Sequence, residues 1–190
     1  MKGFAIVMMV VMADIVVNLT PIPNTVPETQ PVVVETQAPT QAQTEAYIPP
    51  RKDGTIYRIY GTTPPEEWQA YLYAELDAKG YGWFMPYAVC QIFQESRWNQ
   101  WSDNGRDFGL CQQKGVYWAD RAALYGIAGA DIWDPYAQLH VFACMMSAYL
   151  AYYGGDVGMA LSAYYLGAWE YSATYVDAVM AHWNALEVVR

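Results

Sequence analysis

The longest apolar stretch of the chain limits its fold more than any other feature. From Asp134 the sequence reads "DPYAQLHVFACMMSAYLAYYGG", with one acid at its start and two glycines at its end. Asp134 is a typical N-cap, Pro135 suits the first helical position, and Gly154 is a typical stop. A helix that is apolar nearly all round must be buried. The sequence therefore predicts a central helix around which the other elements pack.

The other predicted elements are also mostly helical. A helix is expected from Thr63 to Gly80, with Thr63 as N-cap, Pro64 at the first position and Glu66 completing a capping box. Three more are expected, over about 85–98, after the cap Asp156, and over about 172–189. Only 98–109 has hairpin character, because "DNG" is a turn signal. The prediction is a mainly α domain over 51–190, with at most a small β-hairpin.

The first fifty residues have a different composition. Residues 1–19 hold an apolar run that is short for a bilayer span, so a secretory signal or an N-terminal membrane anchor is expected there. Residues 20–50 hold seven of the 11 prolines and no Lys or Arg, which is typical of a disordered, semi-stiff spacer. The folded domain is therefore expected to be exported, as a secreted or membrane-anchored protein facing the cell wall.

Charge and cysteine content exclude several classes of function. The net charge of -9 argues against nucleic acid, which needs a basic surface. Cys90, Cys111 and Cys144 are too few for a disulfide scaffold and are not spaced for zinc, so one disulfide or buried free thiols both fit. No metal or organic cofactor is implied. Aromatic residues make up 16% of the chain, which suits a carbohydrate groove or a core of large rings.

Glu95 is the first candidate for chemistry. It lies seven residues after Ala88 and three after Ile92, which places its carboxyl at the end of the apolar face of its helix. Partial desolvation there raises the pKa of a carboxyl, as a general acid near neutral pH requires. The alternative is a glutamate that simply points into solvent.

Four segments, taken in order, resemble the soluble lytic transglycosylase domain of the lysozyme-like superfamily. They are Glu95-Ser96 with the polar loop to Gly109-Leu110-Cys111-Gln112, the Asp134-Pro135 helix, "ALSAYYLGA" around Tyr164, and "TYVDAVM". The resemblance covers about 65–189 and implies an α+β lysozyme-like fold. Cys111 stands where the family usually has Met, Tyr165 where it has Asn, and Phe142 where a glycine is common.

This resemblance implies cleavage of the β-1,4 bond between N-acetylmuramic acid and N-acetylglucosamine in peptidoglycan. Glu95 would act as general acid and then base, with the substrate's acetamido group assisting, and the product would be a 1,6-anhydro sugar. Ser96, Gln112 and Tyr164 would position substrate and Glu95, and Tyr165 would lie beside them. Glycan strands are thus the expected partner.

Asp107 leaves a second mechanism open. "RDFGLCQ" also resembles animal-type lysozymes, in which that aspartate is the second carboxylate of a hydrolase. The other interpretation is that Asp107 serves the hairpin or pairs with Arg106 or Arg97, as polar loop acids usually do, while Asp103 suits the turn itself.

Two further alternatives remain at this level. Trp98, Trp101 and Trp118 either stack on sugar rings or belong to the core. The whole domain could instead be a non-catalytic wall-binding module, or a helical domain in which Glu95 has no role.

Overall fold

The computed structural model describes residues 54–167 and 169–189, and every structural statement below concerns these ranges. The predicted signal or anchor over 1–19 and the spacer over 20–50 lie outside them. The described part is mainly helical, which confirms the predicted class. None of its helices combines the length and apolar character that crossing a bilayer would require.

Six α-helices and four short strands make up the described part. The helices are α2 (Glu66–Asp77), α3 (Met85–Ser96), α4 (Gly115–Leu124), α5 (Pro135–Tyr152), α6 (Val157–Leu166) and α7 (Ala173–Trp183), with a 3-10 turn over Gly82–Phe84. The strands are β1 (Tyr57–Ile59), β2 (Asp107–Phe108), β3 (Gln113–Lys114) and β4 (Leu186–Val188). They form two antiparallel pairs, β1 with β4 and β2 with β3.

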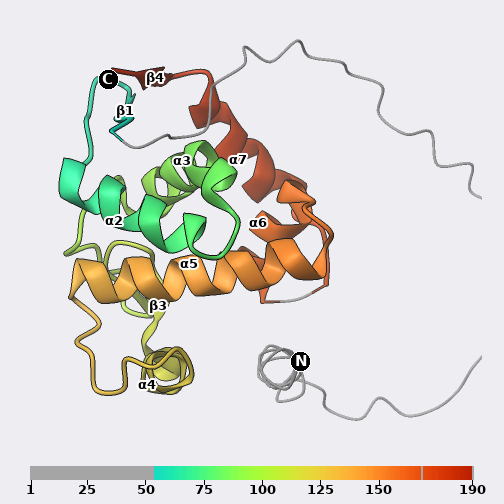
Figure 1. The fold of residues 1–190 in the computed structure, drawn as a ribbon. Helices are drawn as coiled ribbons and strands as arrows, with labels where there is room; N and C mark the ends of the chain where they lie inside the picture. Colours follow the sequence, from blue (N-terminus) through green and yellow to red (C-terminus); the bar gives the residue numbers. More distant parts are fainter. Residues whose placement is uncertain (1–53, 168, 190) are drawn as a thin grey trace, which may run out of the picture. The chain divides into compact units, whose positions relative to one another are not determined.

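Helix α5 is the centre of the fold, as its composition predicts. In Figure 1 it lies between α4 on one side and α2 and α3 on the other, and α6 follows it. Most of its side chains are buried, with Leu139, Phe142 and Leu150 fully enclosed, while His140, Cys144 and Ala148 are half-buried. The Asp134 side chain accepts the backbone N–H of Tyr136, which confirms the predicted cap.

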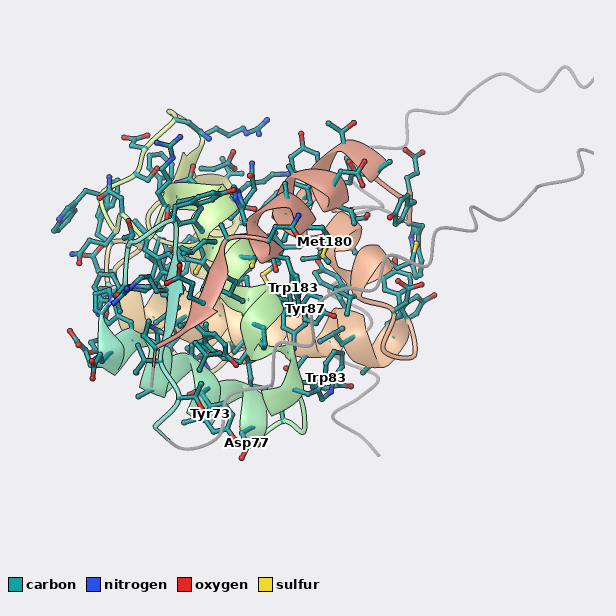
Figure 2. The ribbon with its side chains drawn as sticks, turned by 90° about the horizontal axis from the view of Figure 1, so that it is seen from above. Tyr73, Asp77, Trp83, Tyr87, Met180 and Trp183 are labelled. Atoms are coloured by element: carbon teal, nitrogen blue, oxygen red, sulfur yellow. The ribbon has the colours of Figure 1, made fainter. Side chains whose placement is uncertain are left out.

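Helices α3 and α7 pack antiparallel and bring two distant segments together. At one end of the pair, Tyr87 of α3 lies against Trp183 of α7, with ring centroids 4.5 Å apart (Figure 2). At the other end, Glu95 of α3 meets Tyr175 of α7. The apolar face predicted for α3 is buried, since Met85, Ala88, Val89 and Ile92 have no exposed surface.

The predicted start of the first helix is wrong. Helix α2 begins at Glu66, Pro65 precedes it in an extended conformation, and no side chain caps it. The reason is the tandem proline, because a residue before proline is excluded from the helical region. The Thr63 hydroxyl instead accepts the Arg58 Nε–H at 3.3 Å. In contrast, Asp156 caps α6 as predicted, by accepting the N–H of Met159.

The last helix is shorter than predicted, and three elements, β1, β4 and α4, were not predicted. Helix α7 ends at Trp183, and the chain continues into β4, whose Leu186 pairs with Ile59 of β1. This strand pair joins segments that are more than a hundred residues apart, so no local pattern announces it. Helix α4 was also missed.

Candidate functional site

Glu95 lies in the last turn of α3 and is half-buried. The Tyr175 hydroxyl donates a hydrogen bond to Glu95 Oε1. The pKa of Glu95 is raised to about 7: burial is the largest cause, the hydrogen bond from Tyr175 lowers the pKa, and the negative charge of Asp107 raises it. The carboxyl is therefore close to half-protonated at neutral pH, which suits a group that both gives and takes a proton.

Tyr175 is the hydrogen-bond donor to the Glu95 carboxyl. It is buried in the first turn of α7, and burial raises its pKa well above the usual value, so it stays a neutral donor. Its hydroxyl oxygen accepts the Gln91 Nε2–H at 3.3 Å. The ring of Tyr165 stacks on it at 4.5 Å with planes 6° apart. The motif "TYVDAVM" marks the segment of Tyr175, but nothing in the sequence assigns Tyr175 a role.

Ser96 ties α3 to the polar loop. Its hydroxyl donates to the Leu110 carbonyl at 2.6 Å and lies 3.4 Å from the Ile92 carbonyl. The next two residues, Arg97 and Trp98, have positive φ angles of 54° and 62°, so the chain turns sharply after the helix. Ser96 is buried and therefore positions the loop behind Glu95; the structure gives it little surface for a substrate.

Tyr164 holds the same loop from α6. Its hydroxyl donates to the Cys111 carbonyl at 2.6 Å and accepts the Gln113 Nε2–H at 2.8 Å. Phe142 packs edge-on against the Tyr164 ring, with the ring centroids 5.4 Å apart. The bulk of Phe142 is thus accommodated by an aromatic contact.

Gln138 of α5 completes the support of the loop. Its Oε1 accepts the Cys111 N–H at 2.7 Å, and its Nε2 donates to the Phe108 carbonyl at 2.8 Å. It is fully buried. Sequence reasoning missed it, because a glutamine on an apolar helix carries no distinctive signal.

Gln112 folds back onto its own loop. Its Nε2 donates to the carbonyls of Gly109 at 2.9 Å and Ser102 at 3.2 Å, and its Oε1 accepts the Asn104 Nδ2–H. Asn104 also receives the backbone N–H of Arg106 and Asp107 at its side-chain oxygen, which closes the predicted "DNG" turn. The loop is therefore closely cross-linked by its own amides.

Asp107 is buried, forms an ion pair with the exposed Arg106, and lies close enough for its charge to act on Glu95. Its Oδ2 lies 2.9 Å from an Arg106 guanidinium nitrogen and accepts a hydrogen bond from Asn104 Nδ2. The structure thus contains the Arg106 pairing expected for a hairpin residue. Its negative charge raises the pKa of Glu95, so Asp107 lies near the candidate acid.

The tryptophans divide between core and surface. Trp98 is buried, and its indole N–H donates to the Val89 carbonyl at 3.2 Å, so the core interpretation describes it best. Trp118 is buried as well, with its N–H on the Ala130 carbonyl. Trp101 contacts Trp133 but is 65% exposed, so much of its ring surface is open to solvent.

The cysteines are free thiols in the structure. Cys90 and Cys111 are buried, and burial raises the pKa of Cys90 to about 12, which makes it an inert core residue. Within 54–167 and 169–189, no cluster of His, Cys, Asp and Glu could hold a metal ion.

Comparison with known proteins identifies no relative. No protein family matches the chain, and no curated protein and no solved structure is significantly similar to it.

Proposed function

We propose that this protein is a peptidoglycan lytic transglycosylase that cleaves the β-1,4 bond between N-acetylmuramic acid and N-acetylglucosamine. The observation that carries the proposal is Glu95, a carboxyl whose pKa is raised to about 7 by burial and which accepts a hydrogen bond from Tyr175. A carboxylic acid that is partly protonated at neutral pH can donate to a glycosidic oxygen.

In the proposed reaction, Glu95 is the only protein group that moves a proton. Its O–H protonates the leaving glycosidic oxygen as the bond from the muramyl C1 to that oxygen breaks. The substrate's acetamido oxygen bonds to C1 and stabilises the positive charge. Glu95, now a carboxylate, removes the proton from the muramyl 6-hydroxyl, and O6 displaces the acetamido oxygen at C1. The product is a 1,6-anhydro sugar, and Glu95 is protonated again.

The arrangement of the resembling segments supports this proposal. Hydrogen bonds join the first segment to each of the other three: Cys111 to Gln138, Tyr164 to Cys111, and Tyr175 to Glu95. Residues that are 27 to 80 positions apart in the sequence thus meet at Glu95 and the loop that follows it. In this proposal Ser96, Gln112 and Tyr164 hold the loop beside Glu95, and the exposed ring of Tyr165 contacts the substrate.

The cellular setting follows from the same proposal. The substrate would be glycan strands outside the membrane, reached by an exported enzyme that is secreted or attached through its N-terminal segment. No cofactor is needed, because the substrate supplies both the assisting acetamido group and the attacking hydroxyl.

Hydrolysis by water is the second candidate, and one observation favours it. Asp107 lies close enough to Glu95 for its charge to raise the pKa of Glu95. A second carboxylate at about 5–5.5 Å would suit a nucleophile, and one at about 6.5–9.5 Å would suit a base for water.

Mass spectrometry of fragments released from purified peptidoglycan by the full chain tests the proposal. We expect products one water lighter than reducing sugars, ending in 1,6-anhydromuramic acid, and a loss of about 10²- to 10⁴-fold in Glu95→Gln. The exposed Glu67→Gln is the matched control. Products with ordinary reducing ends would instead indicate a hydrolase in which Asp107 is the second catalytic carboxylate. Sedimentation with the walls without any release would indicate a binding module.

A further inference from the structure

A buried glutamine one turn before Glu95 has no place in the mechanism above. Gln91 has no exposed surface, and its Nε2–H donates to the Tyr175 hydroxyl. Its Oε1 is buried and has no hydrogen-bond partner among the described residues. A buried carboxamide with one end unpaired is costly, so the position calls for a physical explanation.

The order of donors and acceptors explains why the Nε2 end of the Gln91 carboxamide is the one that is hydrogen-bonded. The Tyr175 hydroxyl has one proton, and it gives this proton to Glu95 Oε1. Its oxygen is then free to accept from Gln91 Nε2. This sequence of hydrogen bonds, from Gln91 through Tyr175 to Glu95, is the one that an ionised Glu95 requires, because a carboxylate only accepts.

When Glu95 is protonated, the donor and acceptor roles in this series of hydrogen bonds can be reversed. Its O–H would donate to the Tyr175 oxygen, and the Tyr175 proton would then need another acceptor. The unpaired Gln91 Oε1 becomes that acceptor when the carboxamide turns over. The two ends of a carboxamide have nearly the same shape, so this turn displaces no neighbour.

We propose that Gln91 is a reversible positioning residue, whose carboxamide donates to Tyr175 when Glu95 is ionised and accepts from Tyr175 when Glu95 is protonated. This inference depends on the proposed function for its purpose, because a group that acts first as acid and then as base must be supported in both forms. The whole exchange needs no movement of either helix.

The other titratable groups around Glu95 do not disturb the hydrogen bonds from Gln91 through Tyr175 to Glu95 near neutral pH. Tyr164, Tyr175 and Cys111 all have pKa values raised well above their usual ranges by burial, so they stay neutral. Asp107 is the carboxylate whose charge reaches Glu95. It acts through space and offers no hydrogen bond to Tyr175 in the structure.

The test is a titration of Glu95 in Gln91→Met, a substitution of similar shape. In the ionised form this change removes only a donor, and Tyr175 still donates to Glu95. In the protonated form it leaves the Tyr175 proton without an acceptor, which is the costlier loss. The protonated form is therefore destabilised more, and we expect the pKa of Glu95 to fall by about half a unit or more.

Carboxyl ¹³C NMR of the full chain gives this pKa directly, with Glu95→Gln assigning the signal. Gln94→Met is the matched control, since Gln94 is exposed on the same helix and lies outside the chain of hydrogen bonds. The control should leave the pKa unchanged. A pKa in Gln91→Met that stays or rises would overturn the proposal, because a glutamine that only donates to Tyr175 predicts one of those results.

A second measurement needs no variant at Gln91. In the unmodified protein, the ¹⁵N signal of the Gln91 side-chain amide should move with the same midpoint as Glu95, and a constant signal would contradict the exchange. Neither readout uses lysis of walls. A fall in pKa without any wall cleavage by the unmodified protein would therefore uphold the chain of hydrogen bonds and reject the transglycosylase.

Discussion

At the scale of the residue, Glu95 is held between two opposing influences. Burial favours the neutral carboxyl, and the hydrogen bond from the Tyr175 hydroxyl favours the carboxylate. The result is a pKa of about 7, so both forms are populated near neutral pH. A carboxyl that were only buried would stay protonated, and one that were only hydrogen-bonded would stay ionised. The Tyr175 hydroxyl is therefore as important to the site as the apolar surroundings.

Removal of this hydroxyl gives a prediction with a definite sign. In Tyr175→Phe the ionised form of Glu95 loses its donor while burial remains, so the pKa of Glu95 should rise above about 7. Carboxyl NMR titration measures the change. Tyr165→Phe is the control, because the Tyr165 ring stacks on Tyr175 and none of its contacts described above uses its hydroxyl. A fall in the pKa of Glu95 would show that Tyr175 does not act as the donor.

At the scale of the element, the loop between α3 and α4 decides where the site residues lie. Gly109 allows its close contact with α5, since its φ of +75° favours glycine and a Cβ there would lie 2.2 Å from Gln138 Nε2. Gln138 in turn holds the backbone of Cys111 and Phe108. One glycine thus permits the helix to support the whole loop.

Two glycines of this loop allow backbone strain to be separated from packing. Gly105→Ala meets only the cost of a positive φ, about 1–2 kcal/mol, because no atom lies within 4 Å of the added Cβ. Gly109→Ala meets the same cost and must also displace Gln138. We therefore expect Gly109→Ala to lower the free energy of unfolding by clearly more than Gly105→Ala, as measured by denaturant unfolding. Equal losses would mean that the contact with Gln138 carries no energy.

At the scale of the whole molecule, the elements with strong local signals could be predicted and the elements made by distant contacts could not. Helix α5 and the caps Asp134 and Asp156 follow from composition and single residues. The β1–β4 pair depends on contacts between segments far apart in sequence, and its strands are only three residues long. The predicted start of α2 at Thr63 is wrong because Pro65 keeps Pro64 out of the helical region, so the capping box cannot form.

Glu95 also affects the stability of the whole molecule. Its pKa rises from 4.5 to about 7 on folding, so the folded state binds this proton more tightly than the unfolded chain. The stability it contributes is present below about pH 4.5 and is lost as the pH rises to about 7, at most about 3 kcal/mol. Glu95→Gln should therefore gain stability relative to the unmodified protein across this window.

Denaturant unfolding between pH 4.5 and 8 measures this gain. The exposed Glu67→Gln should follow the unmodified protein at every pH. If Glu95→Gln also runs parallel to the unmodified protein, Glu95 is not desolvated, and the basis of the proposed acid is removed.

The sequence by itself determined the mainly helical class, the buried central helix and the position of Glu95 on an apolar face, because these depend on local periodicity and single residues. Only the tertiary structure decided what surrounds Glu95. Tyr175 and Gln91 reach it because α7 packs antiparallel on α3, and Gln138 supports the loop because Gly109 leaves room for it. Such partners are determined by packing between segments that are distant in sequence, and the pattern of a single segment does not predict them.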